Sequence, residues 1–261
     1  MDGFSVLFEI FLIAVFLTFW KCYFFPRESL RRDRAETVIC CSVMAVCACG
    51  VLFVLLRWSA NDVRDDLGEI TFYLVSALAG IGAAQIAFEF LGMSFRDDAI
   101  ERRNRGALYA FGGVTIGASC CIAGANVGNG PGGEVVLLCA IVSTGALLGL
   151  WILLAKIADA AEAITVERDA GAGLRVGGFL AGCGAAFGAA VAGDWVSPDA
   201  TLRDFMHFSW PVFVASIGVT VVERKLNRRP LARRLGTRTS ALLATAIAMA
   251  GVAYSVWVAR H

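Results

Sequence analysis

The sequence contains little histidine, little charge and no closely spaced cysteine pair of the C-x-x-C type. Its 261 residues include 2 histidines, and 17% of them are charged, compared with roughly 25% in ordinary soluble chains. Two histidines are too few for the usual histidine-rich metal sites, so we expect no metal and no cofactor. A phosphate-binding P-loop and a paired serine and histidine are also missing, so we predict no enzymatic activity.

The cysteines do not form the pattern of a disulfide-stabilised domain. All 9 of them lie within or at the ends of apolar runs. An odd number of cysteines in apolar surroundings is not typical of a disulfide framework. We therefore expect the cysteines to act as small, buried hydrophobic side chains.

Apolar residues, by contrast, are in excess. They make up 58% of the chain, with a mean hydropathy of +0.70, whereas soluble chains contain roughly 45–50%. A stretch of about 20 apolar residues can cross a bilayer as a helix. Eight such stretches occur, at about 5–25, 37–56, 70–92, 106–126, 134–157, 171–193, 205–222 and 238–259. Because these runs are unbroken rather than alternating, they predict an all-α polytopic membrane protein with eight transmembrane helices.

The first apolar stretch resembles a membrane helix more than a signal peptide. The residues before it, Met1, Asp2 and Gly3, are acidic rather than basic. No cleavage site of small residues follows it. We therefore expect 4–20 to be retained as the first membrane helix.

The positive charges gather in alternate connectors between the apolar stretches. The connectors after the first, third, fifth and seventh stretches hold Arg27, Arg31, Arg32, Arg34, Arg96, Arg102, Arg103, Arg105, Lys156, Arg168, Arg224, Lys225, Arg228, Arg229, Arg233, Arg234 and Arg238. The other connectors and the C-terminus hold only Arg57, Arg64, Arg203 and Arg260. Short loops rich in Lys and Arg remain in the cytoplasm. The charges therefore predict a multi-pass protein of the bacterial inner membrane with both termini outside.

The chain repeats with a period of about 65 residues. Each unit consists of an apolar helix, a basic connector and a second helix rich in small residues, and the units begin near 5, 69, 134 and 204. The best matches, 66 residues apart, are Glu101-Arg102 with Glu167-Arg168, Leu108 with Leu174, and Gly112 with Gly178. Two helices in each unit make the repeats parallel. The sequence thus predicts four parallel helical hairpins in two tandem four-helix domains, 1–129 and 130–261.

The residues from 104 to 117 resemble a known family. The run N-R-G-A-L-Y-A-F-G-G at 104–113, followed by Gly117, is similar to the bacterial inner-membrane family called domain of unknown function 350. In that family the second helix of a hairpin starts with a pattern like N-x-A-A and continues with spaced glycines. Asn104, Gly106, Ala107, Gly113 and Gly117 occupy those positions. The resemblance implies helical hairpins and a role in accessory membrane systems, rather than a particular reaction.

The third hairpin resembles a degraded copy of the same pattern. By this alignment Ala170 stands where the second hairpin has Asn104, and Gly178 continues the glycine series. Because the asparagine is missing from this copy, a role that required it in every hairpin is in doubt.

Small residues four positions apart form faces on three of the predicted helices. The pairs are Gly113 with Gly117, Gly145 with Gly149, Gly173 with Gly177, Gly178 with Gly182, and Gly184 with Gly188. Such faces let helix backbones approach closely, because lipid provides no hydrophobic drive for helix association. They predict tight packing within the chain or assembly of several copies into a homo-oligomer.

Few ionisable or strongly polar residues lie inside the predicted spans. Gln85 and Glu89 share one face of the third helix, which is compatible with an ion or proton site, an internal hydrogen bond or a pair with an arginine of the next connector. Asp204 and His207, three residues apart, are a candidate pH-sensitive pair on the outer side. We expect Arg175, one turn into its helix, to reach the cytoplasmic headgroups.

The connector 224–238 is the most basic segment of the chain. Its candidate contact residues are Arg224, Lys225, Arg228, Arg229, Arg233 and Arg234. They favour cytoplasmic orientation and attraction to anionic lipid, or docking of a cytoplasmic partner. The connector has no aromatic residue to stack on bases, so we expect no nucleic-acid binding.

An acidic cluster in the connector after the third helix has two interpretations. Asp97, Asp98 and Glu101 could hold a divalent metal, as in a lipid-modifying enzyme. Because arginines are interleaved with them, salt-bridged helix caps are the simpler interpretation.

Three hypotheses of function follow from these patterns. The leading one is a non-enzymatic integral inner-membrane protein that assembles through small-residue faces and forms a conduit for an ion or small solute. The first alternative is a non-conducting scaffold that recruits cytoplasmic partners, and the second is a lipid-modifying enzyme. The expected partners are membrane lipids, further copies of the chain, and a cytoplasmic or membrane protein.

Overall fold

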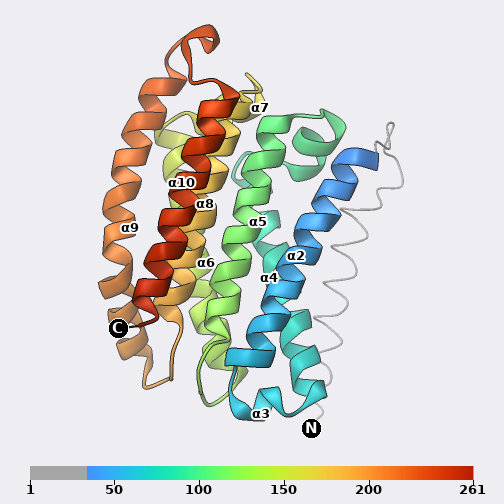
Figure 1. Cartoon of the computed structure of the whole chain (residues 1–261), viewed down its shortest axis with the longest axis vertical. Helices are drawn as coiled ribbons and strands as arrows, with labels where there is room; N and C mark the ends of the chain where they lie inside the picture. The colour runs from blue at the N-terminus through green and yellow to red at the C-terminus, as the bar shows by residue number, and fades with distance from the viewer. Residues whose placement is uncertain (1–33, 261) are drawn as a thin grey trace.

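The computed structural model describes residues 34–260 of the chain, and within that range 83% of residues are helical and no strand is present. The elements in chain order are α2 (Arg34–Trp58), α3 (Asn61–Arg64), α4 (Leu67–Phe90), η1 (Phe95–Glu101), α5 (Arg105–Ala125), α6 (Gly133–Ile157), α7 (Ala160–Thr165), α8 (Ala170–Val191), α9 (Pro198–Asn227), η2 (Leu231–Arg233) and α10 (Thr237–Val258). Figure 1 shows the long helices running side by side in one bundle. The predicted first span, 5–25, lies outside the described residues.

Seven of the described helices are long and apolar enough to cross a membrane. They are α2 over Val38–Trp58, and α4, α5, α6, α8, α9 and α10 over their full lengths. The prediction of an all-α membrane protein is therefore confirmed for the described part of the chain. The total of eight spans stays a prediction.

The seventh predicted span is longer than its apolar core suggested. The sequence predicted 205–222, whereas α9 covers Pro198–Asn227. Ser197 caps the helix, since its hydroxyl accepts a hydrogen bond from the Ala200 N–H at 3.2 Å. Pro198 in the first turn needs no hydrogen-bond donor there, so a proline and a serine begin a helix at this point rather than a loop.

The long helices form two layers. α2, α5, α8 and α10 make one row, in which α5 contacts α8 more extensively than any other pair of described elements do. α4, α6 and α9 pack behind this row against α5 and α8 (Figure 1). The most extensive contact therefore joins helices on opposite sides of the domain boundary predicted at 129/130.

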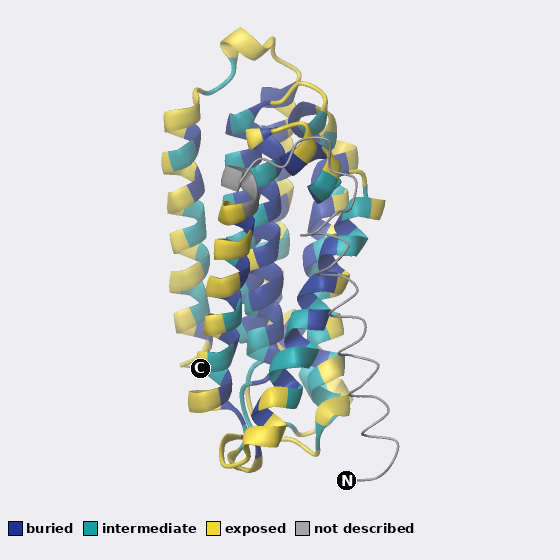
Figure 2. Cartoon of the chain, turned by 90° about the vertical axis from the view of Figure 1, so that its right-hand side faces the viewer, coloured by how far each residue is buried: buried dark blue, intermediate teal, exposed yellow. Residues whose placement is uncertain are grey.

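The core lies between the two layers and consists of large side chains. Phe88 stacks on Trp151 with ring centroids 4.8 Å apart, and both side chains are fully buried. Figure 2 shows buried residues along the central helices and exposed ones along the outer helices. In the apolar windows of α5 and α8, 72% of residues are buried, compared with 11% for α10. The exposed apolar residues of the outer helices suit contact with lipid.

Glycines bring α5 and α8 into backbone contact. A Cβ at Gly113 would collide with the backbone of Gly177, and one at Gly124 would collide with that of Gly188. Gly178 and Gly182 bring α8 equally close to α10. Close approach of this kind is what small-x3-small faces provide in membranes.

The small-residue face of α6 is an exception. A Cβ added at Gly145 or Gly149 would have no neighbouring atom within 4 Å, and both residues are exposed. Four of the five predicted small-residue pairs are therefore used inside the chain, and this one faces outward.

Candidate functional site

The connectors before α5 and α8 meet at one end of the bundle and share a local geometry. Arg103 and Arg168, 65 residues apart, both adopt left-handed backbone angles, with φ of 50° and 57°. The next residue caps the following helix in each case. Asn104 Oδ1 accepts hydrogen bonds from the N–H groups of Gly106 and Ala107, at 2.9 and 3.3 Å. A side-chain oxygen in this position satisfies N–H groups that have no partner within the helix.

The structure corrects the alignment of the third hairpin. Asp169 Oδ1 accepts from the N–H groups of Gly171 and Ala172, at 2.8 and 3.1 Å. Asp169, not Ala170, therefore occupies the position that corresponds to Asn104. The sequence comparison placed it one residue off because it searched for an asparagine, whereas either Asn or Asp serves as a cap.

The two caps differ in what their second polar atom does. Asn104 is buried, and its Nδ2 donates to the carbonyl of Ile164 at 2.6 Å, which ties the start of α5 to α7. Asp169 Oδ2 instead receives a contact from Arg234 Nη1 at 3.4 Å. The family-motif asparagine thus has a structural role, with both ends of its amide satisfied.

Arg175 and Glu223 form a buried ion pair between α8 and α9. Arg175 Nε lies 2.7 Å from Glu223 Oε1, and Nη2 lies 2.9 Å from Oε2, so the contact is bidentate. Each side chain is only 4% exposed. Arg175 Nη1 also donates to Ser240 Oγ at 2.8 Å, which adds α10 to the cluster. The expectation that Arg175 reaches the headgroups was wrong, because a nearby carboxylate satisfies it inside the protein.

Arg234 fixes the basic connector to the connector before α8. Its Nη1 lies 2.5 Å from Glu167 Oε2, and its Nε donates to the Arg229 carbonyl at 2.9 Å. The side chain is 3% exposed. Burial by itself lowers the pKa of the Arg234 guanidinium, but its hydrogen bonds and the charges of Glu167 and Asp169 outweigh burial and raise the pKa above the usual value. Arg234 therefore stays charged and acts as an anchor.

The other basic residues of this segment remain on the surface. Six side chains are exposed, namely those of Arg224, Lys225, Arg228, Arg229, Arg233 and Arg238, and the segment 224–238 contains no acidic residue. We call these six residues the basic surface. Of the candidate contact residues predicted from the sequence, only Arg234 is taken up in internal contacts.

The two polar residues predicted to act together on α4 lie in different surroundings. Gln85 is 2% exposed, and its Nε2 donates to Thr115 Oγ1 of α5 at 3.0 Å. Glu89 is close to the end of α4, where its Oε1 accepts from the Ser94 hydroxyl at 2.9 Å. The structure therefore supports an internal hydrogen bond for each rather than one shared polar site.

The acidic cluster after α4 is engaged in caps and ion pairs. Asp98 accepts from the Ser94 N–H at 2.9 Å and lies 3.1 Å from Arg102. Glu101 lies 3.3 Å from Arg96. No group of three or more potential metal ligands occurs within 34–260.

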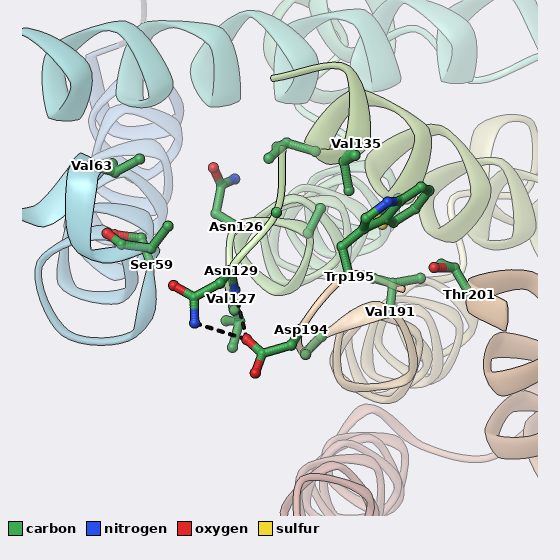
Figure 3. A pocket seen from close by; sticks show the side chains of 18 of the residues that line it. Ser59, Val63, Asn126, Val127, Asn129, Val135, Val191, Asp194, Trp195 and Thr201 are labelled. Carbon is green, nitrogen blue, oxygen red and sulfur yellow. Dashed lines mark hydrogen bonds between the residues drawn. The ribbon is translucent and has the colours of Figure 1, made fainter. Parts of the chain in front are cut away.

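A small pocket of about 90 Å³ lies at the opposite end of the bundle. Asp194 Oδ1 accepts from the N–H and from Nδ2 of Asn129, at 2.8 and 3.0 Å, and Figure 3 shows these side chains with Trp195 around the pocket. Asp204 also lines it. Asp204 and His207 are both exposed, and no hydrogen bond or ion pair joins these two described residues. Their role as a pH-sensitive pair stays a prediction.

Sequence reasoning missed Glu223 altogether. A signal for it was present, because an arginine in the apolar run 171–193 and a glutamate near the end of the next apolar segment are opposite charges in a membrane setting. Intramembrane charges of this kind pair with one another. The two residues are 48 positions apart, so spacing alone did not connect them.

No family model matches the chain, and no similar protein was found among curated sequences or among solved structures.

Proposed function

We propose that the chain is a non-enzymatic membrane scaffold that presents the basic surface to an acidic partner in the cytoplasm. The observation that carries this proposal is the anchoring of Arg234. One arginine fixes the connector to Glu167 and Asp169, and the six other basic side chains remain exposed. A fixed connector loses less conformational freedom on binding than a flexible one.

The proposed orientation follows the positive-inside rule. The connectors that hold most of the positive charge meet at one end, as the hydrogen bonds from Asn104 to Ile164 and from Asn227 to Ala158 require. We place this end in the cytoplasm of a bacterial inner membrane. The eight-helix architecture of four hairpins belongs to the same proposal, and the left-handed residues and caps that recur 65 positions apart support it.

The test is quantitative co-purification of the full chain from its own membranes after chemical cross-linking. Replacing Arg228, Arg229 and Arg233 with Gln should remove an acidic cytoplasmic protein from the cross-linked set. The matched control replaces Arg57, Arg64 and Arg203 at the other end and should retain it. Raising the ionic strength before cross-linking should also release it. Identical cross-linked partners in both variants would contradict the proposal.

A conduit is the second candidate, and the buried Gln85–Thr115 pair favours it. This pair puts hydrogen-bonding groups within the membrane, between α4 and α5. Because Phe88 and Trp151 fill the space between the layers, a conducting path would run between copies of the chain. The exposed Gly145 and Gly149 provide a close-approach face for such copies.

The conduit is tested in proteoliposomes. Cross-linking of a Gly145→Cys variant should yield a dimer, and ion flux should fall when Gln85 is replaced with Leu. Absence of both the dimer and the flux would remove this candidate and leave the scaffold.

A further inference from the structure

A membrane-facing groove runs along the first layer. It has a volume of about 630 Å³ and lies over α5 and α8, between α2 and α10. Gly112, Gly113, Gly177 and Gly178 are among its lining residues, and none of them has a side chain to fill the space. The groove thus results from the same glycines that let the two helices pack closely. Its volume is in the range of small-molecule sites, roughly 300–1,000 Å³.

The length of the groove matches one leaflet of a bilayer. On α5 its lining runs from Arg105, the first residue of the helix, to Ile116. At about 1.5 Å per residue, this part of the helix is about 16 Å long. Half of a hydrocarbon core of about 30 Å is about 15 Å. The groove therefore begins at the basic end of the bundle and reaches about the middle of the membrane.

The charge of the groove is confined to this basic end. Arg103 and Arg105 line it there, and no acidic residue is among its described lining residues. Tyr109 lies one turn further in, at a depth that suits its amphipathic ring. The rest of the lining is glycine, alanine and aliphatic side chains, apart from Asn104 and Thr245. Arginine guanidinium groups bind phosphate oxygens through directed hydrogen bonds.

We propose that the groove binds one anionic phospholipid of the leaflet at the basic end. An acyl chain lies over the glycines of α5 and α8, and the phosphate contacts Arg103 and Arg105. Lipid is the occupant that this geometry fits, because length, apolar lining and positive end match one lipid molecule from tail to headgroup. The site is separate from the basic surface, and it does not depend on the scaffold role.

Gly112→Leu tests the acyl-chain part of the site. A Cβ at Gly112 meets no atom within 4 Å, so a leucine side chain extends into the groove without disturbing helix packing. Gly145→Leu is the matched control, because a Cβ there is equally free but belongs to α6. The proteins are equilibrated with vesicles of phosphatidylglycerol and phosphatidylcholine, purified, and measured by native mass spectrometry. We expect retained phosphatidylglycerol to fall about tenfold in Gly112→Leu and not in the control.

Replacing Arg103 and Arg105 with Gln tests the headgroup part. The preference for phosphatidylglycerol over phosphatidylcholine should fall about fivefold for each arginine, while lipid retention continues. Arg64→Gln, at the other end of the bundle, should leave the preference unchanged. Thermal unfolding of each variant checks that the fold is intact.

Two results would overturn the proposal. The first is unchanged phosphatidylglycerol retention in a folded Gly112→Leu variant. If that variant also changes the oligomeric mass in the same spectra, a second copy of the chain occupies the groove instead of lipid. The second is a preference for phosphatidylglycerol that persists when both arginines are replaced.

Discussion

The two central helices use similar positions for buried polar contacts but different chemistry. α5 contacts α4 through a neutral pair, Gln85 and Thr115, with a donor–acceptor distance of 3.0 Å. α8 contacts α9 through a bidentate ion pair, Arg175 and Glu223, and contacts α10 through Ser240. Both helices are 72% buried in their apolar windows, so burial does not distinguish them.

The difference shows how the cost of losing one partner depends on charge. Without Gln85, Thr115 still donates its hydroxyl proton to the Phe111 carbonyl at 2.9 Å. Without Glu223, Arg175 has only Ser240 as a side-chain partner for its buried charge. An isolated charge in low-dielectric surroundings costs far more than an unpaired hydroxyl or amide. The α8 side is therefore more strongly determined by its partner than the α5 side.

Removing one charge should have the largest effect. We expect Glu223→Ala to lower the free energy of unfolding by about 3–5 kcal/mol, because Arg175 is left buried without a carboxylate. Gln85→Ala is the matched control on the α5 side and should cost less. Unfolding in mixed detergent, followed by circular dichroism, measures both. Equal losses would show that the charged and neutral contacts do not differ in this way.

The two caps should differ less, and in a specific manner. Replacing Asn104 or Asp169 with Ala should cost about 1–2 kcal/mol each, because the N–H groups of the first helical turn lose their acceptor. Only Asp169→Ala should also loosen Arg234 and make the segment 228–238 more sensitive to trypsin. Asp169→Asn keeps the cap and removes the charge, so it should increase sensitivity without the loss of the cap. Equal trypsin sensitivity of the Asn104 and Asp169 variants would argue against the anchor.

Replacing the neutral pair with an apolar residue should have a small effect. Gln85→Met preserves side-chain volume and removes one hydrogen bond, which is worth about 0.6 kcal/mol between membrane helices. A shift in the thermal midpoint of only a few degrees is expected. A loss similar to that of Glu223→Ala would mean that Gln85 has a further partner essential to folding.

Making the α8 side resemble the α5 side should have the smallest effect. When Arg175 and Glu223 are both replaced with Leu, no buried charge is left unpaired, and stability should lie within about 1 kcal/mol of the original chain. The double variant should be more stable than Glu223→Ala alone. If both variants lose equal stability, the ion pair contributes more than mutual compensation.

Some of the local structure was predictable from short stretches of sequence. The apolar runs predict the seven described spans, since a helix satisfies its backbone within the segment wherever it lies in the membrane. The cap at Asn104 follows from its position before Gly106 and Ala107. The end of α9 was less predictable, because Ser197 and Pro198 extend it beyond its apolar core.

The candidate site was less predictable, because its partners are far apart in the sequence. The basic segment 224–238 is evident from composition, but composition does not distinguish Arg234 from the arginines near it. Burial against Glu167 and Asp169 singles it out. Arg175 likewise reads as a residue that reaches the headgroups until α9 brings Glu223 beside it.

The sequence by itself determined that this is an all-helical membrane protein with its positive charge in alternate connectors. Hydropathy and charge act locally, so each span and connector carries its own information. Only the tertiary structure decided which small residues pack inside the chain, which arginines are buried, and where Gly112 leaves a groove open. These outcomes depend on helix order and register, because a glycine is a contact or a gap according to what lies opposite it.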